Sequence, residues 1–290
     1  MLNQTRVTEF IMQGLFDHPQ HQWLIFGLFL CLYMTAIMGN SLIIGAIAIH
    51  PPLHTPMYFF IANLALVDIL CASSVLPKML KNLLQEKKTI SFDGCMAQLF
   101  AFTLSSGTEL VPLTAMSYDR YVAICHPLRY VNLMSKDICI SLAAGVWAVG
   151  TINSLHFFCE IPPVLALSCS STYLNEIMIF MADIFLAMVN FLLTTVSYSF
   201  IIIAIFKIQS SKGKQRAFST CSSHLLVVSF YYSTIIYIYI RPTSSYSLDK
   251  DKMVAIMYTL VTPTLNPVIY SLRNNEIKVA IRKILPFNTK

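Results

Sequence analysis

Long runs of apolar residues, separated by short polar segments, dominate the chain. A membrane-spanning helix needs roughly 20 apolar residues, and seven runs approach that length. They are Leu24–Ile49, Met57–Leu76, Cys95–Ser117, Ile138–Leu155, Ile177–Phe206, Ala217–Ile240 and Met253–Leu272. The apolar positions do not form the single stripes that amphipathic helices of a soluble fold show. The pattern therefore predicts an all-α fold, a seven-transmembrane helix bundle over residues 24–272, in a chain that forms one domain over residues 1–290.

The pattern changes after the last run, where apolar and basic positions alternate with helical spacing over Asn274–Leu285. One face holds Ile277, Ala280, Ile281 and Ile284, and the other holds Lys278, Arg282 and Lys283. This segment is expected to form a short amphipathic helix that lies in the membrane interface, within a tail over residues 273–290.

Composition and charge support a multi-pass membrane protein and give it an orientation. The chain is 56% hydrophobic and 12% charged, which is about half the charged fraction of soluble domains. Most of its 20 Lys and Arg residues fall in segments that are cytoplasmic if the N-terminus lies outside, so residues 1–23 are expected to be extracellular. Attraction to anionic lipid headgroups accounts for the basic inner face, and no nucleic-acid partner is required.

Two further observations narrow the function. The triplet Asn3-Gln4-Thr5 is an N-glycosylation sequon in the predicted extracellular tail. The sequence has no phosphate-binding glycine loop, nucleophile elbow or zinc-ligand spacing. We therefore expect a glycosylated membrane protein that is not an enzyme.

The segment Met116–Cys125, with the sequence MSYDRYVAIC, places Asp119 and Arg120 directly after the third apolar run. A charge is costly inside hydrocarbon but not where a helix meets the cytosol. The segment is therefore expected to present a cation to the inside of the cell. On this reasoning alone, Arg120 is either a functional contact or a cation that extends from the helix end into water.

Six motifs occur in order along almost the whole chain. They are Gly39-Asn40, LHTPMYFF at Leu53–Phe60, MSYDRYVAIC at Met116–Cys125, Ser197-Tyr198, RAFSTCSSH at Arg216–His224 and PTLNPVIYSLRN at Pro263–Asn274. With these motifs the chain resembles a vertebrate olfactory receptor of the rhodopsin-like class of G-protein-coupled receptors. The resemblance implies a plasma-membrane receptor for small, mostly hydrophobic odorants. It also implies that the receptor activates a stimulatory olfactory-type G protein and raises cyclic AMP.

The resemblance also assigns roles in coupling. It implies that Arg120, flanked by Asp119 and Tyr121, contacts the G protein when the inner side opens. It further implies that Tyr198 and Tyr270 move inward on activation. Proline within a span kinks the helix by removing a hydrogen bond, so Asn266-Pro267 forms either a static kink or a movable one.

Two acidic residues, Asp68 and Glu109, fall inside the second and third apolar runs. An unpaired carboxylate is strongly disfavoured there, so each is expected to be neutral, paired or bound to a cation. With Asn40 and Asn266 they are expected to form a polar cluster. The resemblance implies a sodium ion in this cluster, whereas a proton-sharing carboxylate pair is the alternative without an ion. No other cofactor is expected.

The resemblance implies a disulfide between Cys95, at the outer start of the third helix, and Cys159, in the predicted outer loop. It also exposes a departure, because most olfactory receptors carry a longer loop before the HFFCE motif that contains Cys159. Here Leu155 is followed directly by His156, and Cys169 is left without its usual partner. A receptor variant that does not signal is therefore an alternative.

The ligand pocket is expected in the outer half of the bundle, between helices three, five, six and seven. Periodicity and the resemblance together assign to it Phe102, Thr103, Ser106, Gly107, Asp183, Tyr231, Thr234, Ile235, Ile238 and Thr259. This wall is mostly apolar with a few hydroxyls, which suits a small hydrophobic ligand. Asp183 either faces the ligand or is a structural acid between helices.

A transporter or channel is the rival class, because Asp68, Glu109 and Asp183 together resemble an ion path. An odd number of spans gives no inverted repeat, and the sequence shows no pair of broken helices. The receptor hypothesis is therefore preferred.

Overall fold

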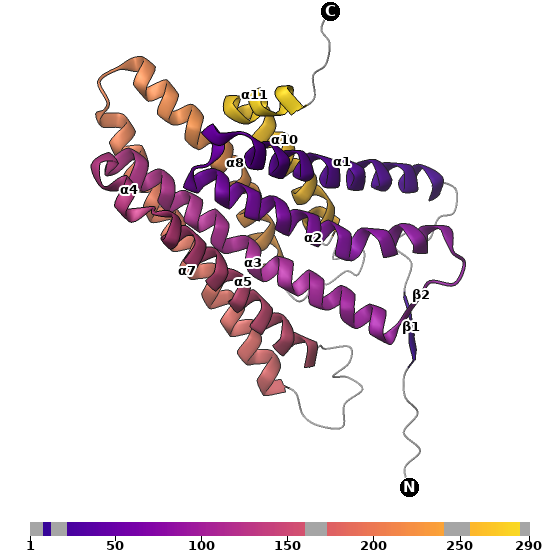
Figure 1. Cartoon of the computed structure of the whole chain (residues 1–290). Helices are drawn as coiled ribbons and strands as arrows, with labels where there is room; N and C mark the ends of the chain where they lie inside the picture. The colour runs from indigo at the N-terminus through magenta and orange to yellow at the C-terminus, as the bar shows by residue number, and fades with distance from the viewer. Residues whose placement is uncertain (1–7, 13–21, 160–172, 241–255, 285–290) are drawn as a thin grey trace, which may run out of the picture.

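The computed structural model describes residues 8–12, 22–159, 173–240 and 256–284. Seven long helical segments within these ranges form a bundle (Figure 1). They are α1 (Gln22–Ile49), α2 (Pro56–Leu84), α3 (Phe92–Cys125), α5 (Lys136–Cys159), α7 (Tyr173–Lys207), α8 (Ser211–Ile240) and the π-helical turn η5 (Met257–Val261) with α10 (Thr262–Arg273). The short elements are η2 (Pro51–Leu53), η3 (Pro127–Arg129), α4 (Tyr130–Leu133) and α11 (Asn275–Ile284).

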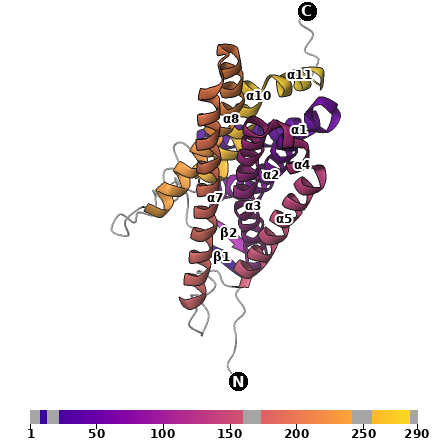
Figure 2. The same ribbon diagram turned by 90° about the vertical axis from the view of Figure 1, so that its left-hand side faces the viewer.

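Strands β1 (Glu9–Ile11) and β2 (Thr89–Ser91) form an antiparallel ribbon in which Phe10 pairs with Ile90. The ribbon lies at one end of the bundle and α11 lies at the other (Figure 2). The first and last described elements therefore sit at opposite ends, as an odd number of crossings requires.

Four of the helices are long and apolar enough to cross a membrane by length and composition, among the residues that the structure describes. These stretches are Gln22–Ile49, Pro56–Leu84, Lys136–Leu155 and Ile184–Lys207. The expectation of seven spans from apolar length alone is thus met in part. Helix α3 shows why a helix of the bundle can be less apolar than a lipid-facing span. It packs against α2, α5 and α7 (Figure 2). A helix covered by protein can carry residues such as Glu109 that lipid would exclude.

Several helices extend beyond their predicted apolar runs, α2 and α8 among them. The second run was predicted to end at Leu76, just before Pro77, yet α2 continues through Pro77 to Leu84. Burial of Leu80 and Leu83 against α1 and the seventh helix stabilises this extension and offsets the hydrogen bond that Pro77 removes. The sixth helix was expected to begin at Ala217, but α8 already begins at Ser211.

The predicted amphipathic helix was confirmed as α11. Ile277 and Ala280 are buried, whereas Arg282 and Lys283 are exposed. Asn274 provides its N-terminal cap, because its Oδ1 accepts hydrogen bonds from the backbone N–H groups of Glu276 at 3.0 Å and Ile277 at 3.3 Å. The cap satisfies donors that lack a partner in the first turn of any helix.

Candidate functional site

Asp119 and Arg120 lie near the end of α3 that is closest to α4 and α11 (Figure 1). Asp119 is buried, and its Oδ1 accepts a hydrogen bond of 2.7 Å from the hydroxyl of Tyr130. Its Oδ2 lies 3.8 Å from Nε of Arg120. Burial and the Asp119 carboxylate raise the pKa of the Tyr130 phenol above its ordinary value, so Tyr130 remains a donor at neutral pH.

The Arg120 side chain is only 16% exposed. Within the described residues its Nε makes no hydrogen bond, and its ion pair with Asp119 is long. Its charge nevertheless acts on groups from several elements: Asp119, Tyr130, Tyr198, His224 and Tyr270. Arg120 is thus the charged centre of a polar site formed by α3, α4, α7, α8 and α10.

Tyr198 of α7 and His224 of α8 connect two neighbouring helices at this site. The Tyr198 hydroxyl is hydrogen-bonded to Nδ1 of His224, and their rings stack with centroids 5.7 Å apart. Tyr121 packs against the cluster of Tyr198, Ile201 and Cys221. Tyr198 and Tyr270 are both buried, and their inward movement on activation stays a prediction.

Sequence reasoning missed two partners in this site, Tyr130 and His224. His224 is the last residue of the RAFSTCSSH motif, so the motif included His224 but gave no sign that Tyr198 is its partner. Tyr130 lies beyond the MSYDRYVAIC motif, and nothing in local spacing indicates that it folds back to Asp119. Both contacts join different helices, which a one-dimensional pattern does not reveal.

The second half of the site is the polar core between α1, α2, α3 and α10. The Asn266 amide donates to both carboxylate oxygens of Asp68, at 3.1 and 2.9 Å. Glu109 is buried close enough to Asp68 for the two carboxyl groups to interact electrostatically. Asp68, Glu109 and Asn266 therefore lie together in this core.

Asn40 takes a different part in this core from the one expected. Its Nδ2 donates to the carbonyl oxygens of Ala36 at 2.9 Å and Pro263 at 3.0 Å. Pro267 has no backbone N–H, so the carbonyl four residues earlier, that of Pro263, lacks its helical donor. Asn40 supplies that donor from α1. The Asn40 amide therefore stabilises the seventh helix where Pro267 removes a hydrogen bond, and no contact with Asp68 is described for it.

Gly39 permits this contact, because a Cβ at its position would lie 2.9 Å from Cβ of Pro267. Any larger side chain would push α1 away from α10. The two members of the Gly39-Asn40 motif thus serve one purpose: the glycine allows the approach and the asparagine pairs the free carbonyl.

The predicted ligand wall is described in part. Phe102, Thr103 and Ser106 are half-buried on α3, and the hydroxyl of Ser106 donates to the Phe102 carbonyl at 3.0 Å. Tyr231 and Thr259 are buried, and Thr234 is half-buried. The side chains of Asp183, Ile235 and Ile238 lie outside the described residues, so their place in the wall stays a prediction.

Gly107 does not fit this wall as expected. A Cβ at Gly107 would meet the Cα of Gly150 at 3.8 Å and the amide of Asn153 at 3.9 Å, and both belong to α5. The position therefore lies at the α3–α5 contact. Its helical phase is the reason, since it is one residue, or about 100°, from Ser106.

Cys95 has a free thiol in this structure, and its expected pairing with Cys159 stays a prediction. The side chain of Cys159 lies outside the described residues, as do Asn3 and Cys169. The backbone is helical up to Cys159, so the prediction that Cys159 lies in a loop was wrong. No glycine or proline follows Gly150 in α5, and nothing local therefore ends the helix earlier.

Comparison with known proteins places this arrangement in a family. Residues 39–270 match the model of the 7 transmembrane receptor (rhodopsin family). The chain is 51% identical to human olfactory receptor 13A1, over 99% of this chain and 93% of that protein. It is also 51% identical to human olfactory receptor 13G1, over 99% of each, and 44% identical to mouse olfactory receptor 5AR1, over 98% of this chain and 97% of that protein.

The two human matches run over 305 and 304 aligned residues, whereas the whole chain has 290. These relatives therefore hold positions within the aligned range that this chain lacks. The segment before the HFFCE motif stays the predicted place of this difference.

Proposed function

Because the chain belongs to the olfactory receptors of the rhodopsin-like seven-transmembrane family, we propose that it binds small, mostly hydrophobic volatile molecules and activates a stimulatory olfactory-type G protein. Activation would raise cyclic AMP. In the proposed orientation the N-terminus lies outside and Arg120 lies at the cytoplasmic end of α3. The plasma membrane is the proposed location.

The observation that supports this function is the state of Arg120. A buried guanidinium normally makes several hydrogen bonds, yet Nε of Arg120 has none within the described residues and lies 3.8 Å from Asp119. Asp119 is held on its other oxygen by Tyr130. The Nε donor of Arg120 therefore has no hydrogen-bond acceptor among the described residues, as expected of a residue that exchanges an internal partner for an external one.

The proposed mechanism is a shift between two conformations that already exist in equilibrium. An odorant that binds the active conformation better increases its population. The movable elements are α8, held to α7 by the Tyr198–His224 contact, and α10, which bends at Pro267. Outward movement of α8 would open the site around Arg120 to the G protein.

The proposed ligand site is the outer part of the bundle, with Phe102, Thr103, Ser106, Tyr231 and Thr234 in its wall. An apolar wall with a few hydroxyls favours a hydrophobic molecule fixed by one or two hydrogen bonds. Asp183 is the proposed determinant for ligands that donate hydrogen bonds. Comparing Asp183→Asn with the unaltered chain over an odorant panel tests this role, and an unchanged response profile would exclude it.

We also propose a bound sodium ion, a disulfide and a glycan. Sodium would occupy the polar core, where Asp68 and Glu109 offer carboxylate oxygens close to each other. Cys95 and Cys159 would form a disulfide in the oxidising exterior, and Asn3 would be glycosylated. Non-reducing peptide mapping tests the disulfide, since it finds either a linked peptide pair or two free thiols.

A receptor that does not signal is the second candidate, and the missing aligned residues are the observation that favours it. A shortened connection before α7 would leave the outer face of the pocket uncovered or impair folding. Surface staining combined with a cyclic AMP assay against an odorant panel separates the two candidates. Surface expression with a response supports the receptor, whereas surface expression without any response supports the silent variant. Odorant-evoked current that persists without G protein would contradict both.

A further inference from the structure

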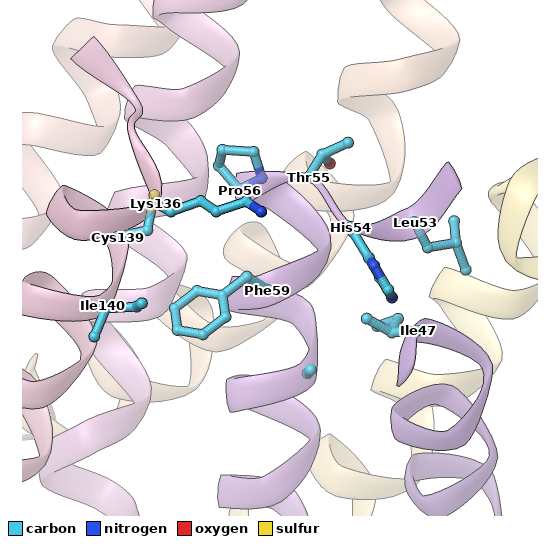
Figure 3. A pocket seen from close by; sticks show the side chains of 10 residues that line it. Ile47, Leu53, His54, Thr55, Pro56, Phe59, Lys136, Cys139 and Ile140 are labelled. Atoms are coloured by element: carbon cyan, nitrogen blue, oxygen red, sulfur yellow. The ribbon is translucent and has the colours of Figure 1, made fainter. Parts of the chain in front are cut away.

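A cavity of about 250 Å³ opens at the end of the bundle where α1 turns through η2 into α2 (Figure 3). Its walls come from α1, η2, the start of α2 and the start of α5. The lining residues are Ile47, Leu53, His54, Thr55, Pro56, Phe59, Ala62, Lys136, Cys139 and Ile140. None of the functions assigned above uses this cavity.

The lining separates into an apolar interior and a polar rim. Leu53 and Cys139 are buried and Phe59 is half-buried, whereas His54, Thr55 and Lys136 are exposed. Figure 3 shows the Lys136 side chain extending from α5 towards Pro56 at the start of α2. Its ammonium group therefore lies on one side of an apolar opening.

Among the described residues, no carboxylate lies within ion-pairing distance of Lys136. The ion pair found in this part of the chain joins Asp119 and Arg120. Asp137 follows it in sequence but does not line the cavity. Lys136 is also the first residue of α5, a helix whose N-terminal turn carries partial positive charge. The rim thus offers an unneutralised cation above an apolar space.

We propose that this cavity binds an anionic phospholipid of the cytoplasmic leaflet, with part of one acyl chain in the apolar interior and the headgroup at Lys136. The assignment to that leaflet rests on the proposed orientation of the receptor. Basic pockets between transmembrane helices on the cytoplasmic side are suited to anionic headgroups. The single cation of Lys136 matches the net charge of −1 of a lipid such as phosphatidylserine.

Size and charge argue for this occupant over the alternatives. The volume is below the 300–1,000 Å³ of pockets that enclose a whole drug-sized ligand, so a chain segment fits better than a rigid sterol. A zwitterionic phospholipid has no net charge, so it would gain less from Lys136 than a lipid with a net charge of −1. The anionic phospholipid uses both the apolar interior and the charge.

The occupied cavity would contact the coupling site through shared packing. Cys139 and Leu53 belong to the same buried cluster as Val122 and Tyr58, and Tyr130 packs against that cluster. The lipid would therefore support the wall that positions Tyr130 beside Asp119.

The test uses the full chain in phosphatidylcholine nanodiscs that contain a trace of phosphatidylserine with a photoreactive group on one acyl chain. The matched probe is phosphatidylcholine with the same group. After illumination, mass spectrometry maps the labelled peptides. We expect the serine lipid to label residues 56–62 and 136–140 preferentially, about fivefold over the choline lipid, which is the effect of one basic residue near an anionic surface.

Lys136→Ala should abolish this preference, whereas Lys207→Ala, which removes an exposed cation at the end of α7, should keep it. Ala62→Phe, which fills the cavity, should abolish labelling by both probes while the protein remains monodisperse. Equal labelling by the two probes, labelling spread evenly over the helices, or displacement by a sterol but not by unlabelled phosphatidylserine would overturn the proposal. The readout needs neither odorant nor G protein, so failure of the proposed function would not affect it.

Discussion

The side-chain amide of Asn40 lies 3.0 Å from the carbonyl oxygen of Pro263, a group that Pro267 leaves without its helical partner. One hydrogen bond thus joins the Gly39-Asn40 motif to the PTLNPVIYSLRN motif, between residues 223 positions apart in the chain. The carbonyl that Pro267 leaves without a helical donor is thus paired from the first helix, and this hydrogen bond links the two helices near the proline.

Replacing Asn40 with Ala should lower the thermal stability of the receptor. The Pro263 carbonyl would stay buried without a donor, and hydrogen bonds between membrane helices contribute about 1 kcal/mol. Thermal unfolding in detergent, followed by thiol exposure, measures the loss. Ser41→Ala, at the exposed neighbour, should change little, and equal melting of the two variants would contradict the role given to Asn40.

Gly39→Ala should also destabilise the bundle, because the new Cβ would lie 2.9 Å from Cβ of Pro267. Overpacking of this kind costs about 1–3 kcal/mol. Gly45→Ala is the matched control on the same helix, where nothing lies within 4 Å of the added Cβ. It should be neutral or slightly stabilising, since alanine favours helix by up to about 1 kcal/mol. A melting temperature that falls equally in both variants would argue against a close approach at Gly39.

The Tyr198–His224 contact should be energetically coupled. A double-mutant cycle of Tyr198→Phe and His224→Phe isolates the pair, and a net hydrogen bond contributes about 0.5–1.5 kcal/mol. The control cycle pairs Tyr118→Phe with His224→Phe, because the exposed Tyr118 lies on another helix. Additive effects of the Tyr198 and His224 changes on unfolding would show that the contact is not formed in the membrane.

The cap on α11 gives a local prediction. Asn274→Ala should increase hydrogen exchange over residues 275–284, because losing an N-cap costs about 0.5–2 kcal/mol. Asn274→Asp should restore protection, since a carboxylate accepts the same backbone hydrogen bonds. Exchange that is fast in both variants would mean that the amide donation to Tyr58, 3.0 Å long, matters more than the cap.

Local sequence patterns predicted those parts of the molecule that depend on local periodicity. The buried face of α11, with Ile277 and Ala280, follows from spacing alone. The end of α2 could not be predicted from spacing, because Pro77 is tolerated only through packing of residues such as Leu80 with other helices. The same limit applies to the site: Arg120 was found from its motif, whereas Tyr130 and His224 become recognisable only when separate helices are brought together.

The most direct test of the account is coupling by Arg120→Ala at matched surface expression, with cyclic AMP as the readout for any odorant that activates the unaltered chain. Arg129→Ala is the control, because Arg129 is exposed in η3 near the same end of the bundle. The account predicts that Arg120→Ala loses the response while Arg129→Ala keeps it. A full response from Arg120→Ala would contradict the proposal that this guanidinium passes the signal to the G protein.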